Sequence, residues 1–155
     1  MSERRSSETG SSSSMGYAGD LDPRETWERL AREAAAQLID VRTVPEWNFV
    51  GVPDLGPLQR QALFCEWQHF PPAANGKFVQ EVVEALKQTG YRAGAPLFFL
   101  CRSGARSRAA AIALTEAGYG PCFNIKDGFE GALDRERHRG GSAGWKAEGL
   151  PWMQT

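Results

Sequence analysis

Two patterns of apolar residues alternate along this chain, short continuous runs and longer stretches with helical spacing. Short runs that are almost wholly apolar occur at 37–41 (QLIDV), 62–67 (ALFCEW), 96–100 (PLFFL) and 122–125 (CFNI). Runs of this length predict strands, and a continuously apolar run such as 96–100 is typical of a strand buried on both faces of a parallel sheet. The stretches between these runs space their apolar residues three or four positions apart, which predicts helices.

The first helix is predicted to begin at Asp22 and Pro23, an N-cap aspartate followed by a proline at the first helical position. Glu25 lies in the first turn, where a negative charge is favourable. The apolar positions that follow at helical spacing are Trp27, Leu30, Ala31, Ala34 and Leu38.

Two further helices and one helical turn are predicted downstream. An amphipathic stretch at 78–86 is closed by Gly90, and the alanine-rich run at 107–117 is stopped by Gly118. A single helical turn is predicted at 43–47. Strands that alternate with helices of about ten residues predict an α/β fold built on a parallel sheet.

The length of the chain, 155 residues, predicts one domain. Residues 1–19 are rich in serine and poor in large apolar side chains, so they cannot bury enough surface to offset the entropy of ordering them. We therefore expect a disordered tail at 1–19 and a folded domain over 20–155.

Composition favours no highly charged partner. The chain is 41% hydrophobic and 24% charged with a net charge of −1, which gives no reason to expect nucleic acid or a membrane as a partner. The N-terminal stretch has no apolar signal segment, and no apolar run is long enough to span a bilayer. We expect a soluble, cytoplasmic protein with reduced thiols.

Three cysteines, Cys65, Cys101 and Cys122, are widely spaced and form no CxxC pair. The two histidines have no partner ligand at zinc-like spacing, so neither a disulfide framework nor a metal site is expected. Cys65 and Cys122 lie inside strand patterns and are interpreted as small core residues. Cys101 differs because of the residues that follow it.

Cys101 follows the strand at 96–100 and begins a small, basic turn, CRSGARS (101–107). In a parallel sheet, ligands bind beyond the carboxyl ends of the strands, where Cys101 lies. Backbone N–H groups of the turn and the positive end of the next helix stabilise a sulfur there only as the thiolate. Arg102 and Arg106 add permanent positive charge. The turn predicts a thiolate nucleophile for an anionic substrate; the alternative is a buried structural cysteine beside surface arginines.

The turn CRSGARS resembles the active-site loop of the rhodanese family of sulfurtransferases, and the resemblance covers most of residues 21–155. LIDVRTVPEW (38–47) resembles the family's strand and acidic-aromatic turn, CFNIKDGFEG (122–131) its strand and glycine-rich turn, and GWKAEGLPW (144–152) its closing segment. The resemblance implies a single rhodanese-like domain whose central parallel sheet of about five strands is flanked by helices on both faces.

For function, the resemblance implies transfer of a sulfane sulfur through a persulfide on Cys101, with thiosulfate as a typical anionic donor. The acceptor is cyanide, a small thiol or a protein cysteine, and no cofactor is required. The residues expected to cradle the donor and then the persulfide are Arg102, Ser103, Gly104, Ala105, Arg106 and Ser107. Asp40 and Arg42 match a buried aspartate and arginine of the family, for which we expect an architectural ion pair; the alternative is that Arg42 faces the pocket.

Two other functions remain open. Cysteine-dependent phosphatases and arsenate reductases use a similar cradle, but tyrosine-phosphatase-type loops place arginine six positions after the nucleophile, where this chain has Ser107. Arg106 lies at position five and ends a shorter loop, which suits a sulfur substituent better than a tetrahedral oxyanion. The other alternative is a catalytically silent rhodanese-like binding module, although such modules typically lack the cysteine.

The chain departs from the family pattern in two places. Residues 48–60 replace a histidine-containing segment, and GALDRERHRGGSAG (131–144) lengthens the path to the closing segment. This insertion carries Arg135, Arg137, His138 and Arg139. Our hypothesis is that it lies over the active site and that its arginines recruit an anionic donor or an acidic partner; the alternative is a solvated charged loop.

Overall fold

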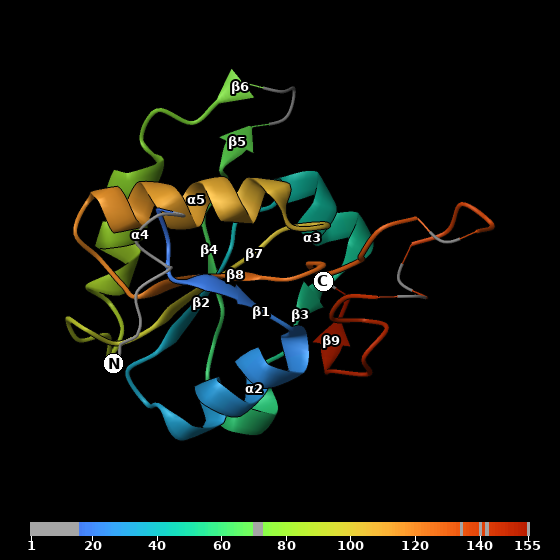
Figure 1. The fold of residues 1–155 in the computed structure, drawn as a ribbon, viewed down its shortest axis with the longest axis horizontal. Helices are drawn as coiled ribbons and strands as arrows, with labels where there is room; N and C mark the ends of the chain where they lie inside the picture. The colour runs from blue at the N-terminus through green and yellow to red at the C-terminus, as the bar shows by residue number, and fades with distance from the viewer. Residues whose placement is uncertain (1–15, 70–72, 134, 140, 142, 155) are drawn as a thin grey trace.

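Five parallel strands make the central sheet of this computed structural model, which describes residues 16–69, 73–133, 135–139, 141 and 143–154 (Figure 1). In spatial order they are β1 (Gly19–Leu21), β8 (Cys122–Ile125), β7 (Leu97–Leu100), β2 (Gln37–Asp40) and β4 (Leu63–Phe64). Each neighbouring pair in this sheet is parallel. The parallel α/β sheet that the sequence predicts is confirmed.

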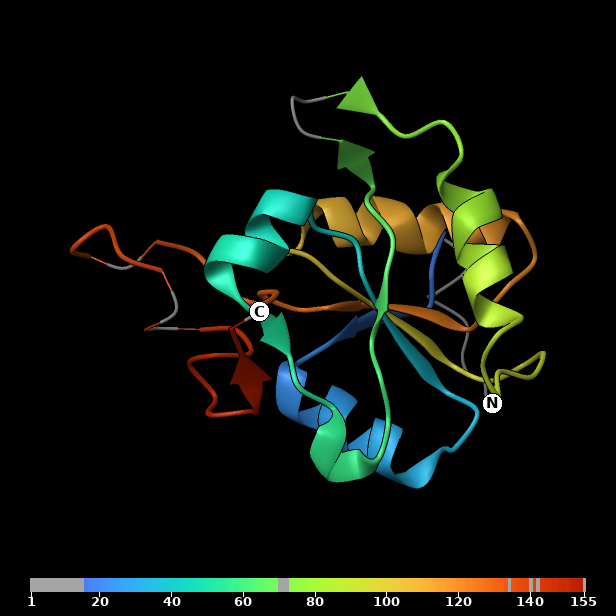
Figure 2. The same ribbon diagram turned by 180° about the vertical axis from the view of Figure 1, so that it is seen from behind.

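Helices cover both faces of the sheet. α4 (Phe78–Leu86) and α5 (Ala105–Glu116) lie on one face, and α2 (Pro23–Arg32) lies on the other (Figures 1 and 2). α3 (Val44–Val50) follows the carboxyl end of β2, and the 3-10 helix η1 (Gly56–Leu58) lies near α2. No helix in the described part of the chain is long and apolar enough to cross a membrane.

Alternate residues of the strands point into two apolar clusters, one on each face. Leu97, Phe99 and Cys101 join the cluster that contains residues of α4 and α5. Phe98 and Leu100 join the cluster that contains residues of α2. The strand β7 is therefore buried on both faces, which explains why its sequence is continuously apolar rather than alternating. This arrangement also turns the Cys101 side chain toward the α5 side.

Two short antiparallel pairs lie outside the central sheet. β3 (Val52–Pro53) pairs with β9 (Trp152–Met153), and β5 (Gln68–His69) pairs with β6 (Ala73–Ala74). The first pair ties the segment after α3 to the end of the chain. It therefore anchors part of the 48–60 region, where the family resemblance is weakest.

Two predicted helices and the helical turn predicted at 43–47 differ from the observed elements in their bounds. The turn is the start of a longer helix, α3, which extends to Val50. α2 ends at Arg32, so Ala34 lies outside the helix and Leu38 lies in β2. The helical spacing of these two positions was coincidental, because the chain must leave the helix in order to enter the sheet. α5 begins at Ala105, two residues before the predicted start, because the end of the cysteine turn already forms the first helical turn.

Of the residues 62–67 that were predicted to form a strand, only Leu63–Phe64 form a regular strand in the sheet. β4 is an edge strand, and Phe64 is 43% exposed. Beyond it, the N–H groups of Cys65 and Trp67 still donate to the carbonyls of Asp40 and Val41, at 3.1 and 3.0 Å. The apolar run therefore remains attached to the end of β2 without extending the regular strand.

Of the predicted tail at 1–19, residues 1–15 lie outside the described residues. Tyr17 is 5% exposed and packs in the cluster on the α4 and α5 side. The Ala18 N–H donates to the Cys122 carbonyl at 2.8 Å, and Gly19 is the first residue of β1. The packed part of the chain thus includes residues that the sequence pattern assigned to the tail.

Replacing Asp22 with alanine is expected to lower the free energy of unfolding by about 1 kcal/mol. The reason is that the Asp22 carboxylate accepts a 2.7 Å hydrogen bond from the Glu25 N–H at the start of α2. Urea unfolding followed by circular dichroism measures the change. Glu28→Ala, at an exposed position of the same helix, is the control and should change the free energy by less than about 0.5 kcal/mol. Equal losses in both variants would contradict the capping role.

Candidate active site

Cys101 lies directly after β7, at the carboxyl end of the sheet, and is 1% exposed. The neighbouring strand β2 is in register with β7, so that Asp40 lies opposite Leu100. The segments that follow these two strands therefore start side by side. Cys101 is at the place where parallel α/β sheets bind their ligands.

Three polar groups surround the Cys101 sulfur. The Gly104 N–H donates to it at 3.1 Å and the Ser107 N–H at 3.3 Å, and the Ser107 hydroxyl oxygen lies 3.1 Å away. Both N–H groups belong to the N-terminal end of α5, whose unpaired donors carry partial positive charge. An anionic sulfur gains more from these donors than a neutral thiol does.

A glycine makes this turn possible. Gly104 has a φ of +122°, a backbone conformation that residues with a side chain rarely adopt. This conformation leads the chain from the cysteine turn into α5, so that the N–H groups of Gly104 and Ser107 face the same sulfur. Gly104, which the sequence places in the donor cradle, therefore has a backbone role at the sulfur.

The segment after β8 is hydrogen-bonded to the backbone of the cysteine turn. Phe129 donates its N–H to the Cys101 carbonyl at 2.8 Å, and the Gly131 N–H donates to the Arg102 carbonyl at 3.1 Å. At Gly128, a Cβ atom would come within 2.4 Å of the Cys101 carbonyl oxygen. Only glycine permits this approach, so the glycine-rich turn at 122–131 acts by holding the backbone of the cysteine turn.

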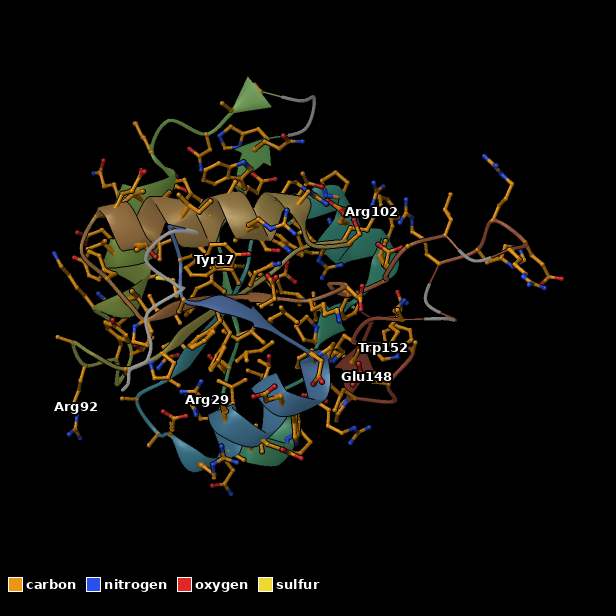
Figure 3. The ribbon with its side chains drawn as sticks, in the orientation of Figure 1. Tyr17, Arg29, Arg92, Arg102, Glu148 and Trp152 are labelled. Carbon is orange, nitrogen blue, oxygen red and sulfur yellow. The ribbon has the colours of Figure 1, made fainter. Side chains whose placement is uncertain are left out.

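The two arginines of the turn have different surroundings. Arg106 forms a bidentate ion pair with Glu46 of α3, with N–O distances of 2.7 and 2.9 Å. Burial raises the pKa of Glu46, but hydrogen bonds from Arg106 and Thr43 outweigh it and lower that pKa to about 2. Arg102 is exposed and lies beside α3 (Figure 3). The sequence predicts that both arginines bind the donor, whereas the structure pairs Arg106 with a carboxylate.

A cavity of about 340 Å³ opens beside the turn. It is lined by Thr43, Pro45, Glu46, Gln68, Arg102 and Arg106. Larger cavities, of about 470 and 710 Å³, lie near η1 and around α4, and none of the predicted site residues lines them. Both arginines of the turn line the smaller cavity, so we take it as the candidate site for an anionic donor.

Asp40 and Arg42 form the expected ion pair, fully buried at an N–O distance of 2.6 Å. Arg42 also donates to the Gly51 carbonyl at 2.9 Å, and its guanidinium lies 4.3 Å over the ring of Phe129. The pair joins the end of β2 to the segment after α3 and to the loop below the cysteine turn. These contacts agree with the architectural interpretation, and Arg42 does not line the cavity beside the turn.

Ser107 connects the sulfur to a further buried residue that the sequence analysis did not single out. The Ser107 hydroxyl hydrogen-bonds to Oδ1 of Asn124, which lies on β8 and is 2% exposed. The sequence does contain a signal for Asn124, because it is a polar residue within the otherwise apolar run CFNI. A buried amide requires hydrogen-bond partners, and here one partner belongs to the site.

The other two cysteines are core residues, as the sequence analysis predicts. Burial, with a contribution from Glu81, raises the pKa of the Cys65 thiol to about 11. Burial likewise raises the pKa of the Cys122 thiol to about 11. Burial therefore opposes formation of the thiolate at both positions.

The first residue of the insertion at 131–144 is hydrogen-bonded to the cysteine turn. The Gly131 N–H donates to the Arg102 carbonyl, and Arg139 donates to the Gly131 carbonyl at 2.8 Å. Arg135 and Arg137 are exposed. The described part of the insertion extends away from the central sheet (Figure 1). Recruitment of a donor or partner by its arginines stays a hypothesis.

A family model described as the STR4 middle domain matches residues 19–155 of this chain. The "uncharacterized protein RP600 homolog" of Rickettsia rickettsii is 38% identical over 129 residues, which are 83% of this chain and 92% of that protein. The "uncharacterized protein RC0915" of Rickettsia conorii is 37% identical over 129 residues, which are again 83% of this chain and 92% of that protein.

Two solved structures share the fold. Rv0390 from M. tuberculosis superposes with a TM-score of 0.81 at 47% identity, over 90% of this chain and 99% of that one. The 30 kDa polysulfide-sulfur transferase homodimer from Wolinella succinogenes gives a TM-score of 0.55 at 23% identity, over 88% of this chain and 78% of that one. The rhodanese-like fold implied by the sequence resemblance is thus confirmed; the second similarity concerns the fold alone.

Glu46→Gln is expected to destabilise the protein by about 2 kcal/mol at pH 7. The pKa of Glu46 falls from 4.5 to about 2 on folding, so its stabilising effect is full above pH 4.5 and is lost as the pH falls toward 2. The difference from wild type should therefore shrink over that range in urea unfolding. Glu84→Gln, which removes an exposed ion pair with Lys87, is the control and should cost less than about 0.5 kcal/mol. A constant Glu46→Gln difference down to pH 3 would contradict the role of the ion pair.

Proposed function

Because the chain belongs to the STR4 middle domain family, we propose that it is a sulfurtransferase whose Cys101 carries the transferred sulfur. The observation that carries the proposal is the position of the Cys101 sulfur. It accepts hydrogen bonds from two N–H groups at the start of α5, next to a cavity with an exposed arginine. These donors stabilise the anionic sulfur that attacks the donor, and they remain in place for the inner sulfur of the persulfide.

The proposed first step uses thiosulfate as the donor. The Cys101 thiolate attacks the outer sulfur, a new S–S bond forms, and the donor's S–S bond breaks with its electron pair leaving on sulfite. The protein then holds a persulfide anion on Cys101. Polysulfide, the substrate class in the name of the Wolinella succinogenes protein, presents the same kind of terminal sulfur and would react in the same way.

The second step returns the protein to its starting state. Cyanide or a thiolate attacks the outer sulfur of the persulfide, and the S–S bond breaks with its electron pair returning to the Cys101 sulfur. The products are thiocyanate or an acceptor persulfide. The cycle as written consumes no oxidant or reductant and uses no cofactor. Since Cys101 is 1% exposed, we expect acceptors to be small or to present an extended cysteine at the cavity.

The residues of the turn divide between the sulfur and the donor anion. Gly104 and Ser107 hold the sulfur through their N–H groups. Arg102, exposed at the cavity, is assigned to the sulfonate of the donor. Arg106, held by Glu46, is assigned to the cavity wall. In this proposal, binding of the donor therefore depends more on Arg102 than on Arg106.

The phosphatase alternative is less well supported. A phosphoryl group in such a loop needs a guanidinium directed at its oxygens. Here the residue six positions after the cysteine is Ser107, which is fully buried against the sulfur, and Arg106 is already paired. The silent binding module is less well supported because the cysteine and its donors are both present.

Incubation with thiosulfate is expected to add one sulfur, about 32 Da, to the intact protein, as measured by mass spectrometry under non-reducing conditions. Cys101→Ser should abolish the gain, whereas Cys65→Ser, at a buried core cysteine, should retain it. Later addition of cyanide should remove the sulfur. An unmodified wild type that hydrolyses an aryl phosphate would favour the phosphatase, and an unmodified wild type with neither activity would favour the binding module.

Arg102→Ala is expected to raise the KM for thiosulfate about tenfold with a smaller change in kcat, because a charge-assisted contact with the donor is lost. Initial rates of thiocyanate formation over a range of thiosulfate concentrations measure both constants. Arg92→Ala is the matched control, since Arg92 lies at the opposite end of the sheet from Arg102 (Figure 3) and its loss changes the net charge equally. An equal KM in the two variants would remove Arg102 from the donor site.

A further inference from the structure

A chain of hydrogen-bonded polar side chains leads from the Cys101 sulfur to β1. Ser107 contacts both the sulfur and Asn124 Oδ1. Asn124 Nδ2 donates to Oδ1 of Asp20 at 2.9 Å, and the Tyr17 hydroxyl donates to the same oxygen at 3.0 Å. The link is built into the sheet, because Asp20 of β1 and Asn124 of β8 are register partners.

Asp20 determines which way round the Asn124 amide lies. A carboxylate only accepts hydrogen bonds, so it must face the NH₂ group of the amide. The amide oxygen is then directed at Ser107. A reversed amide would place its oxygen against the carboxylate and leave two acceptors in contact, one of them on a residue that is 2% exposed.

The orientation of the amide in turn determines where the Ser107 proton points. Ser107 has one hydroxyl proton and three acceptors within reach: Asn124 Oδ1, the Gly104 carbonyl oxygen at 3.2 Å and the Cys101 sulfur at 3.1 Å. The contact with Asn124 is the shortest of the three. With the proton directed there, the hydroxyl oxygen presents a lone pair to the sulfur.

This arrangement fits the thiol form of Cys101, whose S–H donates to the Ser107 oxygen. A thiolate in the same place faces a lone pair. It gains the Ser107 proton only if the hydroxyl turns away and leaves the buried Asn124 oxygen without that donor. The side chains thus oppose part of the preference for the thiolate that the two N–H groups create.

We infer that Asp20 and Asn124 are positioning residues that, through the Ser107 hydroxyl, favour the protonated form of Cys101 when no donor is bound. The inference rests on the proposed function in one respect, namely that the Cys101 sulfur is the nucleophile. Its consequence is protection: the resting thiol is less open to oxidation and alkylation than a free thiolate.

Other charged groups lie around the sulfur and the hydrogen-bond chain and must stay constant in a test. Arg106 of α5 interacts electrostatically with Cys101, and Glu46 and Asp40 interact with Arg106. Arg102 is the next residue of the turn, Asp127 has its backbone nitrogen near Gly104, and Arg108 of α5 interacts with Tyr17. A useful variant therefore changes the hydrogen-bond chain without replacing any of these groups. Asp20 on β1 allows this, because it is exposed and its hydrogen bonds reach the sulfur only through Asn124 and Ser107.

The test is the pH dependence of Cys101 alkylation by iodoacetamide, followed on the Cys101 peptide by mass spectrometry. In Asp20→Asn, the neutral amide accepts either orientation of Asn124, which frees the Ser107 proton for the sulfur. The midpoint of the pH–rate profile is expected to fall by about 0.5–1 pH unit, which makes alkylation about three- to tenfold faster below the midpoint. An unchanged midpoint in a folded Asp20→Asn variant overturns the inference.

Two further variants separate the hydrogen-bond chain from simpler effects. Tyr17→Phe removes a hydrogen bond to the same oxygen of Asp20 but leaves the carboxylate and Asn124 in place, so its midpoint is expected to stay within about 0.2 pH unit of wild type. In a Ser107→Ala background, Asp20→Asn is expected to have no effect. If the Asp20→Asn shift persists there, the cause is loss of negative charge acting through space, and the inference is wrong.

The inference and the proposed function fail in different measurements. If wild type gains sulfur from thiosulfate but Asp20→Asn leaves the alkylation profile unchanged, the function stands and the inference falls. If the profile shifts as expected and wild type gains no sulfur, the inference stands and the sulfurtransferase proposal falls. Circular dichroism and urea unfolding of each variant show that the comparison is between folded proteins.

Discussion

A sulfur buried at the end of a strand can react as an anion only if hydrogen-bond donors replace water around it, and the structure depends on this constraint. The donors for Cys101 are the N–H groups of Gly104 and Ser107, which the start of α5 leaves unpaired by other backbone groups. The chain passes from the turn into α5 through the positive φ of Gly104, and the backbone of Gly128 closely approaches the carbonyl of Cys101. The strand β7, buried on both faces, keeps the cysteine in place beneath them.

Most of the charged residues around this turn form ion pairs that connect the elements of the site. The segment 38–47 contributes both residues of the Asp40–Arg42 ion pair and Glu46 of the Glu46–Arg106 ion pair. The first pair is fully buried, and each side chain of the second is one-fifth exposed. Together they connect β2, α3 and α5, and they leave Arg102 as the exposed arginine of the turn. Recognition of an anion in this proposal therefore rests on backbone donors, the end of a helix and Arg102. The Asp20–Asn124–Ser107 chain adds an opposing influence from the far side of the sulfur.

The sequence predicts the features that local patterns determine. A continuous apolar run followed by a glycine-containing turn and an alanine-rich helix indicates a buried strand, Cys101 at its end and a helix N-terminus at the sulfur. Features that depend on pairing across the fold were not predictable in this way. Glu46 and Arg106 are 60 positions apart, and Asp20 and Asn124 are 104 positions apart. They meet because of sheet order and register, which one-dimensional spacing does not contain. Leu38 shows the converse, a helical spacing that the sheet overrides.

The central claim is that Cys101 itself carries the sulfur between donor and acceptor. Thiosulfate radiolabelled only in its outer sulfur tests it most directly. The account predicts that one labelled sulfur per chain becomes attached to the Cys101 peptide, and that added cyanide then releases all of that label as thiocyanate. If thiocyanate forms at the same rate while no label is ever attached to Cys101, the sulfur passes directly from donor to acceptor, and the account is wrong.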